Sequence, residues 1–261
     1  MRLAELKRPF ICTVIAESTC GETIAEIDEV EETIGTDAFE VNLAPLELES
    51  LGDVFSCTNL PCIATNRRAE FMKVYGYSSL TPINDAQRAA RLLKALDQGA
   101  RAIDFELDLF DRSRGPKKKE ITRNAEAIKQ QKALVKRVKS SGGEVVVSSH
   151  SQLRISRGQV TDLAQAIQSR GADFAKIVTT TFDYKDIIEL QETARMLSSR
   201  LSIPFNLMNI GEYAVLGRLL STLCGSSWVY CRTESEHSYK GQPLTSEAKD
   251  FRQKYFATFK S

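Results

Sequence analysis

The stretch ADFAKIVTT, residues 172–180, decides the fold. Its run of apolar residues predicts a short strand that is buried on both faces, as in a parallel sheet covered by helices. Segments with helical spacing lie on either side, GQVTDLAQAIQSRG (158–171) and DYKDIIELQETARMLSSR (183–200), and PFNLMNI (204–210) follows as the next strand. A strand, a helix and a second strand in this order predict a right-handed crossover between two parallel strands.

The same alternation runs through the whole chain. We expect further strands over 9–16, 38–43, 61–66, 102–109, 144–150 and 227–232, and further helices over 21–35, 45–56, 84–99, 121–143, 212–225 and 245–259. Eight such units in about 250 residues predict an α/β fold, the (β/α)8 TIM barrel. A doubly wound open sheet would need a phosphate-binding glycine loop, and the chain has neither GxGxxG nor GxxxxGK[ST]. Because there is no linker or low-complexity segment, we expect a single domain over residues 1–261.

Charge and hydropathy exclude several classes of partner. The formal net charge is +1, so no overall field attracts nucleic acid or an anionic membrane. No apolar run approaches the roughly 18 residues of a membrane span, and the N-terminus lacks the apolar stretch of a signal peptide. We therefore expect a cytoplasmic protein. The basic segment DRSRGPKKKE (111–120) predicts a solvated loop, with anion steering or a partner contact as the alternative.

The six cysteines give no sign of a metal site or a disulfide framework. They stand at positions 12, 20, 57, 62, 224 and 231, with no CxxC and no histidine at metal-ligand spacing. We expect reduced, mostly buried thiols.

Lys176 stands in the middle of the strand predicted over 174–180. A charged ammonium is costly to bury unless it is paired or loses its proton. Desolvation lowers the pKa of a buried lysine, and the neutral amine can form a Schiff base with a ketone. The alternative is a structural lysine that reaches the rim of the barrel or pairs with Asp104 or Glu106.

Other polar residues also stand late in the predicted strands, where the active site of this fold forms. The chain has only two histidines, and both fall in such places: His150 ends the strand over 144–150, and His237 lies in the loop after the last strand. Since His150 is on the strand next to that of Lys176, it is the candidate base for the proton beside an imine.

Several motifs together resemble the type I 3-dehydroquinate dehydratase family. They are FICTVIAES near the N-terminus, DAFEVNL, IDFEL with Asp104, VVSSH with His150, ADFAKI with Lys176, Arg218 and the late SYKGQ. The resemblance covers nearly the whole chain in order. It implies a (β/α)8 barrel that needs no metal or organic cofactor. The implied reaction is the dehydration of 3-dehydroquinate to 3-dehydroshikimate through a lysine imine, in the shikimate pathway of aromatic amino acid biosynthesis.

The resemblance also implies roles for individual residues. Lys176 would form the imine, His150 would be the general acid and base, and Asp104 would orient His150. Five side chains would bind the substrate: Arg218 its carboxylate, Glu40 and Arg67 its hydroxyl groups, and Ser238 and Gln242 from a mobile loop that closes over it. Members of the family often form dimers through the outer helices of the barrel, so the resemblance allows a homodimer.

Some positions depart from the family pattern. Asn42 stands where a hydroxyl-binding arginine is usual, and Phe71 stands where a carboxylate is expected near the histidine, with Glu70 one place early. After His150, an Asp-Phe pair is replaced by Ser151 and Gln152. These departures leave two alternatives open: a Schiff-base lyase or aldolase that acts on a different keto acid, or a non-catalytic binding protein. Since the chain ends at Ser261, we expect no fused shikimate dehydrogenase domain.

Overall fold

The computed structural model describes residues 1–111 and 120–256, and in these ranges eight strands alternate with eight α-helices. The strands are β1 (Phe10–Ile15), β2 (Ala38–Asn42), β3 (Cys62–Thr65), β4 (Ala102–Glu106), β5 (Glu144–His150), β6 (Phe174–Thr181), β7 (Phe205–Gly211) and β8 (Trp228–Cys231). The helices are α1 (Cys20–Thr33), α2 (Leu51–Ser56), α3 (Asp85–Asp97), α4 (Ala125–Ser140), α5 (Arg157–Ser169), α6 (Tyr184–Ser198), α7 (Ala214–Leu223) and α8 (Thr245–Phe256). Two short 3-10 helices, η1 (Leu3–Glu5) and η2 (Phe71–Tyr75), have no counterpart in the sequence prediction.

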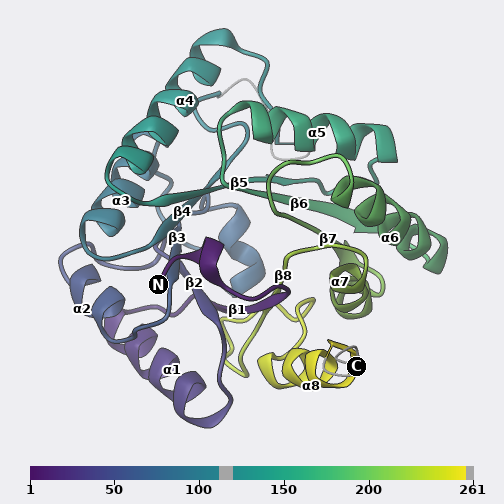
Figure 1. Cartoon of the computed structure of the whole chain (residues 1–261). Coiled ribbons are helices and arrows are strands. Elements are labelled where there is room, and N and C mark those ends of the chain that lie inside the picture. The colour runs from purple at the N-terminus through teal and green to yellow at the C-terminus, as the bar shows by residue number, and fades with distance from the viewer. Residues whose placement is uncertain (112–119, 257–261) are drawn as a thin grey trace.

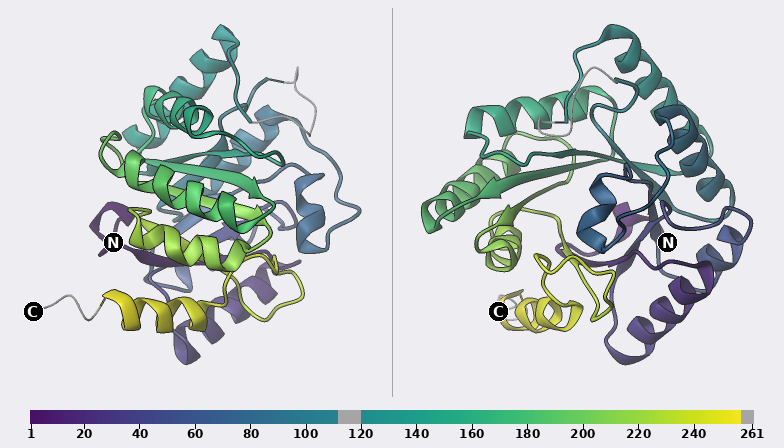
Figure 2. Two further views of the ribbon diagram at one scale, coloured as in Figure 1. Left: turned by 90° about the vertical axis from the view of Figure 1, so that its right-hand side faces the viewer. Right: turned by 180° about the vertical axis from the view of Figure 1, so that it is seen from behind.

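The strands form one parallel sheet that bends round into a nearly closed barrel, as predicted. Their order is β7-β6-β5-β4-β3-β2-β1-β8, so the two edges are β7 and β8. These edges face each other: the Ser227 amide donates to the Phe205 carbonyl at 2.7 Å, and Asn206 Nδ2 donates to the Trp228 carbonyl at 2.7 Å. The helices lie around the outside of the strands (Figure 1), and the strand arrows point away from the end where the N-terminus lies (Figure 2).

The alternation of side chains along each strand separates two cores. Odd-numbered residues of β6, such as Ile177, pack outward with the helices, whereas Phe174 and Val178 pack inside the barrel. Lys176 has the inward parity and is paired in register with Ser148 of β5 and Asn206 of β7. This geometry places the polar late-strand residues in the lumen of the barrel. Below them, the stacked rings of Phe10 and Trp228 close the other end.

Side-chain caps set the helix starts. Thr19, Asn84, Ser156 and Asp183 each accept a hydrogen bond from a backbone amide in the first turn and form a capping box. Asn124 caps α4, so this helix begins four residues later than the predicted 121.

The helix predicted over 45–56 is too long, because α2 begins only at Leu51. Arg91 donates from Nη2 to the carbonyls of Leu43 and Leu46, at 2.6 and 2.5 Å. These bonds hold the preceding segment in a turn.

No helix within the described ranges is long and apolar enough to cross a membrane. The same residues hold no cluster of three or more His, Cys, Asp or Glu side chains that could ligate a metal ion. All six cysteines are free thiols, as predicted. Most of the basic segment, residues 112–119, lies outside the described residues.

Candidate active site

A pocket of about 130 Å³ opens where the strands end, at the place the sequence predicts for the active site. Six of the eight predicted residues line it: Glu40, Arg67, His150, Lys176, Arg218 and Gln242. The other two predicted residues, Asp104 and Ser238, do not line the pocket but are connected to residues that do. Asp104 is hydrogen-bonded to Lys176, and Ser238 belongs to the loop after β8, which also carries Gln242.

Lys176 is buried in this pocket, with 4% of its surface exposed. Its Nζ donates to Glu40 Oε2 at 2.8 Å and to Asp104 Oδ2 at 2.9 Å, and it lies 4.0 Å from the centroid of the Tyr230 ring. Two carboxylates and an aromatic face stabilise the ammonium form of a lysine. The pairing with Asp104 that the sequence left open as an alternative is therefore present in the resting protein.

The guanidinium of Arg67, expected to bind substrate, is already bonded to other side chains of the protein. It is ion-paired with Asp104 and with Glu106, the latter at 3.3 Å, and it donates to Ser148 Oγ at 3.0 Å. Arg88 pairs with the second oxygen of Glu106. Burial favours the neutral form of Asp104 and Glu106, but the positive charges around them outweigh it and hold the pKa of both carboxyls below the ordinary range. These ion pairs keep the polar layer charged although it is buried.

His150 has a different partner from the expected one. Its Nδ1 lies 2.6 Å from Glu120 Oε2, and its backbone amide donates to the same oxygen at 2.8 Å. The carboxylate of Asp104 is bonded instead to Arg67 and Lys176. No hydrogen bond joins Asp104 to His150 among the described residues, although the two interact electrostatically through space. The Phe71 ring packs against the imidazole in a T-shaped arrangement, with 5.1 Å between ring centroids.

Arg218 is a buried guanidinium with no acidic partner within residues 1–111 and 120–256. It is 5% exposed, and its polar contacts are Nε to the Asn209 carbonyl at 3.1 Å and Nη1 to Met208 Sδ at 2.9 Å. No carboxylate lies within 4 Å of it in the described part of the chain. Burial lowers the pKa of Arg218. An anionic ligand group in the pocket would supply the missing counter-charge.

The loop after β8 contributes Tyr239 and Gln242 to the lining of the pocket. His237 stacks on Tyr77 at 4.6 Å between centroids, and its ring nitrogens contact the Tyr75 carbonyl at 3.1 Å and Ser18 Oγ at 3.2 Å. Ser238, one of the expected substrate-binding residues, is buried and shares a hydrogen bond of 3.1 Å with Thr233. The loop is therefore held in place by the hydrogen bond between Ser238 and Thr233 and by the contacts of His237 with Tyr77, Tyr75 and Ser18.

One wall of the pocket is apolar. It comes from η2 and the residues beside it, with Phe71, Val74 and Tyr75 lining the space. Asn42 does not take the place of the usual arginine, because its amide donates to Met72 Sδ at 3.0 Å and accepts from the Ala44 amide at 3.1 Å. A ligand bound here would thus meet carbon on the side where the family pattern places a guanidinium.

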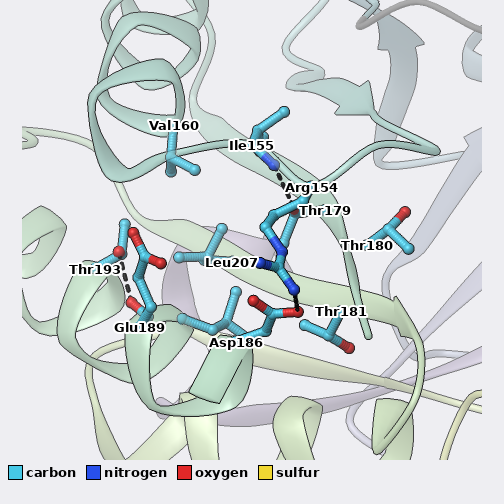
Figure 3. Close-up of a pocket in the computed structure, with 11 residues that line it drawn as sticks. Arg154, Ile155, Val160, Thr179, Thr180, Thr181, Asp186, Glu189, Thr193 and Leu207 are labelled. Carbon is cyan, nitrogen blue, oxygen red and sulfur yellow. Dashed lines mark hydrogen bonds and ion pairs between the residues drawn. The ribbon is translucent and has the colours of Figure 1, made fainter. Parts of the chain in front are cut away.

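A second pocket lies between α5 and α6, beside the end of β6 (Figure 3). Its volume is about 20 Å³, which is room for a water molecule but not for a metabolite. Arg154 points across it to Asp186, with a distance of 2.7 Å. We assign it no function.

A model of type I 3-dehydroquinase matches residues 11–258. The chain belongs to this family.

Relatives of known identity agree with this membership. The chain is 27% identical over 254 residues to the bifunctional chloroplastic 3-dehydroquinate dehydratase/shikimate dehydrogenase of Arabidopsis thaliana, which covers 94% of this chain and 37% of the relative. The chain therefore spans little more than a third of that protein. Among solved structures, the type I 3-dehydroquinate dehydratase of Clostridium difficile with covalently modified comenic acid has a TM-score of 0.79 at 19% identity, covering 97% of this chain and 95% of that one. The 3-dehydroquinate dehydratase of Geobacillus kaustophilus has a TM-score of 0.78 at 17% identity, covering 100% and 97%.

Sequence reasoning within the family pattern missed three contributors to the site. Glu120 is the partner of His150, Tyr230 lies over Lys176, and Tyr239 faces Arg218 at 5.9 Å. The inward parity of β8 could have indicated Tyr230. Glu120 and Tyr239 lie in irregular segments, whose side chains have no periodic pattern to follow.

Proposed function

We propose that this protein is a hydro-lyase that dehydrates 3-dehydroquinate to 3-dehydroshikimate through a Schiff base on Lys176. One observation carries the proposal: a buried amine, an imidazole and a buried guanidinium, the last with no carboxylate partner among the described residues, line one pocket. An amine attacks a ketone, an imidazole moves a proton, and a guanidinium binds a carboxylate. These are the three groups that the reaction of a hydroxylated keto acid needs.

The first step of the proposed reaction is imine formation. Lys176 passes its extra proton to Glu40, whose Oε2 lies 2.8 Å away, and the neutral amine attacks the ketone carbon of the substrate. The carbinolamine then loses water to give the iminium. Asp104 lies 2.9 Å from the same nitrogen, and its negative charge favours the cationic iminium.

The second step is elimination. His150 takes the proton from the carbon next to the iminium, and the electron pair of that C–H bond forms an enamine. The enamine expels the hydroxyl group on the following carbon, which leaves as water after His150 returns the proton. Hydrolysis of the conjugated iminium releases the enone and restores the lysine amine, so no oxidant or reductant is needed.

Arg218 binds the substrate carboxylate in this proposal. The reach of the guanidinium into the pocket fixes which end of the ring lies next to Lys176. Glu40, Arg67, Ser238 and Gln242 remain the candidates for the substrate hydroxyl groups. Because Arg67 is already bonded to two carboxylates and Ser148, we expect its contribution to come mainly from the charge that it places near the ring.

Borohydride trapping with 3-dehydroquinate tests the proposal. We expect a permanent mass increase on Lys176, located by peptide mapping, together with formation of the conjugated enone in the untreated enzyme. Lys176→Ala should show neither, whereas Lys185→Ala, which removes an exposed lysine of α6, should behave like the native protein. Absence of both adduct and enone in the native protein would overturn the proposal.

A second candidate is a Schiff-base enzyme for a cyclic keto acid with fewer hydroxyl groups. The apolar wall of η2 and the turned-away Asn42 favour it, because a hydroxyl group against carbon loses its hydrogen bonds to water. An adduct with 3-dehydroquinate but no enone would favour this candidate. Binding of the ligand without any adduct would instead indicate a non-catalytic binding protein.

A further inference from the structure

Glu120 makes two contacts with His150 through one carboxylate oxygen, and this carboxylate has no part in the reaction steps proposed above. One carboxylate oxygen lies 2.6 Å from Nδ1 of the ring and 2.8 Å from the backbone nitrogen of the same residue. Both side chains are largely enclosed, at 13% and 15% exposure for the histidine and the glutamate. A carboxylate at this distance from one ring nitrogen fixes the orientation and the tautomer of an imidazole.

The main chain holds Glu120 in place independently of its carboxylate. Its carbonyl accepts from Ser149 Oγ at 2.8 Å, and its amide donates to the His150 carbonyl at 3.3 Å. Two residues later, the Thr122 amide donates to the Leu107 carbonyl at 3.3 Å. Glu120 is thus bonded to the end of β5, and Thr122 bonds the same segment to the residue that follows β4.

This arrangement decides which nitrogen of His150 can act as a base. The Nδ1–H donates to the carboxylate, so the lone pair of the neutral ring is on Nε2. When Nε2 takes a proton from the substrate, the ring becomes a cation and the negative charge of Glu120 stabilises it. Without Glu120, the ring could rotate or exchange the tautomer.

We propose that Glu120 is the positioning residue of His150, an inference that rests on the proposed dehydratase function. It acts through the imidazole and has no role in binding the substrate. Other charges face the same ring: Asp104 of β4 acts on it through space, and Arg67, Lys176 and Glu70 line the pocket with it. Among these described groups, Glu120 is the one with a hydrogen bond to the ring.

Glu70 provides a matched control. It is an exposed carboxylate that lines the same pocket, and the sequence pattern had placed the expected carboxylate next to it, at position 71. Glu120→Gln keeps an oxygen for the backbone amide of His150 but removes the charge. We expect roughly a ten- to a hundredfold fall in kcat with 3-dehydroquinate, with KM changed less than about twofold. Glu70→Gln should change kcat less than about threefold, and Glu120→Asp should recover part of the loss.

A spectroscopic measurement tests the contact without any turnover. Because the chain has only two histidines, the ring ¹⁵N signals of His150 can be assigned by comparison with His237→Asn. The neutral ring of the native protein should carry its proton on Nδ1. In Glu120→Ala the proton should move largely to Nε2, and in Glu70→Ala it should stay on Nδ1.

The kinetic and the ¹⁵N measurements distinguish a failure of the proposed function from a failure of the role proposed for Glu120. If the native protein makes no enone, the proposed function fails, and the tautomer alone decides whether Glu120 holds the ring. An unchanged tautomer in Glu120→Ala would overturn the inference, as would a Glu120→Gln variant with native kcat. A fall in kcat accompanied by an equal rise in KM would also overturn it, because that pattern indicates substrate binding.

Discussion

The charged floor, a buried layer of six side chains of which three line the pocket, and the corner at Arg218 differ in how their charges are balanced. The floor holds three cations and three anions, Arg67, Arg88, Lys176, Glu40, Asp104 and Glu106, and each has at least one opposite charge within 4 Å. Arg218 is equally buried, but its described partners are a carbonyl and a sulfur atom. The charges of the floor are paired without a ligand, whereas the described part of the chain places no anion beside Arg218.

This difference separates stability from binding. A buried ion pair whose geometry is good is costly to break, because removal of one member leaves the other charge unpaired. An unpaired buried guanidinium costs stability in the free protein and gains it back when an anionic ligand arrives. We therefore expect substitutions in the floor to weaken the fold, and substitution of Arg218 to weaken binding.

The largest effect on stability should come from Lys176→Met. This change leaves Glu40 without its described cation, and we expect the free energy of unfolding to fall by about 3–5 kcal/mol. Adding Glu40→Gln should recover part of the loss, because the unpaired charge is then gone. Urea unfolding of the two single variants and the double variant gives the interaction energy.

The double-mutant cycle of Lys176 and Glu40 tests directly whether the charges of the floor are coupled. If the losses of Lys176→Met and Glu40→Gln simply add, the two side chains are not coupled, and the floor is not a balanced unit. A Lys176→Met variant as stable as the native protein would show the same.

The next effect is on binding, in Arg218→Met. We expect this variant to lose roughly ten- to a hundredfold in affinity for 3-dehydroshikimate, from the loss of about 1.5–3 kcal/mol of charge-assisted hydrogen bonding. Its unfolding free energy should be unchanged or higher, because an apolar side chain replaces an unpaired buried charge. Calorimetric titration and urea unfolding measure the two quantities.

Arg88→Met is the matched control for this variant. Arg88 is also a buried arginine, 1% exposed, but it is paired with Glu106 and does not line the active-site pocket. We expect the opposite pattern, a clear loss of stability with nearly unchanged affinity. If both arginine variants lose stability to the same extent, the distinction between floor and corner is wrong.

The sequence predicts where the floor residues lie better than it predicts their partners. Strand–helix alternation gives the barrel, and the alternation of side chains directs Lys176, Asp104 and His150 toward one lumen. The choice of partner depends on distances of a few ångströms across the barrel. Asp104 pairs with Lys176 and Arg67, and Glu120, 30 residues before His150, takes the position expected for a carboxylate.

The segments that the sequence described least well are irregular ones. The 3-10 helix η2 forms the apolar wall, and nothing in the pattern around Phe71 indicates a turn of helix. For the segment that ends at Glu120, the sequence predicts a solvated basic loop, with anion steering or a partner contact as the alternative. Glu120 is bonded to Ser149 and His150, and the Tyr75 carbonyl of η2 contacts His237. Such long-range contacts leave no trace in the local spacing of residues.

The smallest expected effect concerns the rim of the floor, at Asp108, and it depends on pH. Burial, with added repulsion from Glu120 and Glu106, outweighs the attraction of Arg68 and raises the pKa of Asp108 from 3.8 to about 6. The native protein therefore holds this proton more tightly than the unfolded chain does. The resulting stabilisation is fully present below pH 3.8 and is lost as the pH rises through about 6.

Asp108→Asn does not titrate, so its stability relative to the native protein should rise between pH 4 and pH 8, by about 2 kcal/mol. The attraction of Arg68 is already contained in the raised pKa of Asp108, so loss of this ion pair adds no separate pH dependence to the rise. Urea unfolding at several pH values gives the difference, with Asp97→Asn, at an exposed carboxyl of α3, as the control. A difference that stays constant or falls over this range would mean that Arg68 compensates the buried charge fully, and that the balanced part of the floor extends outward to Asp108.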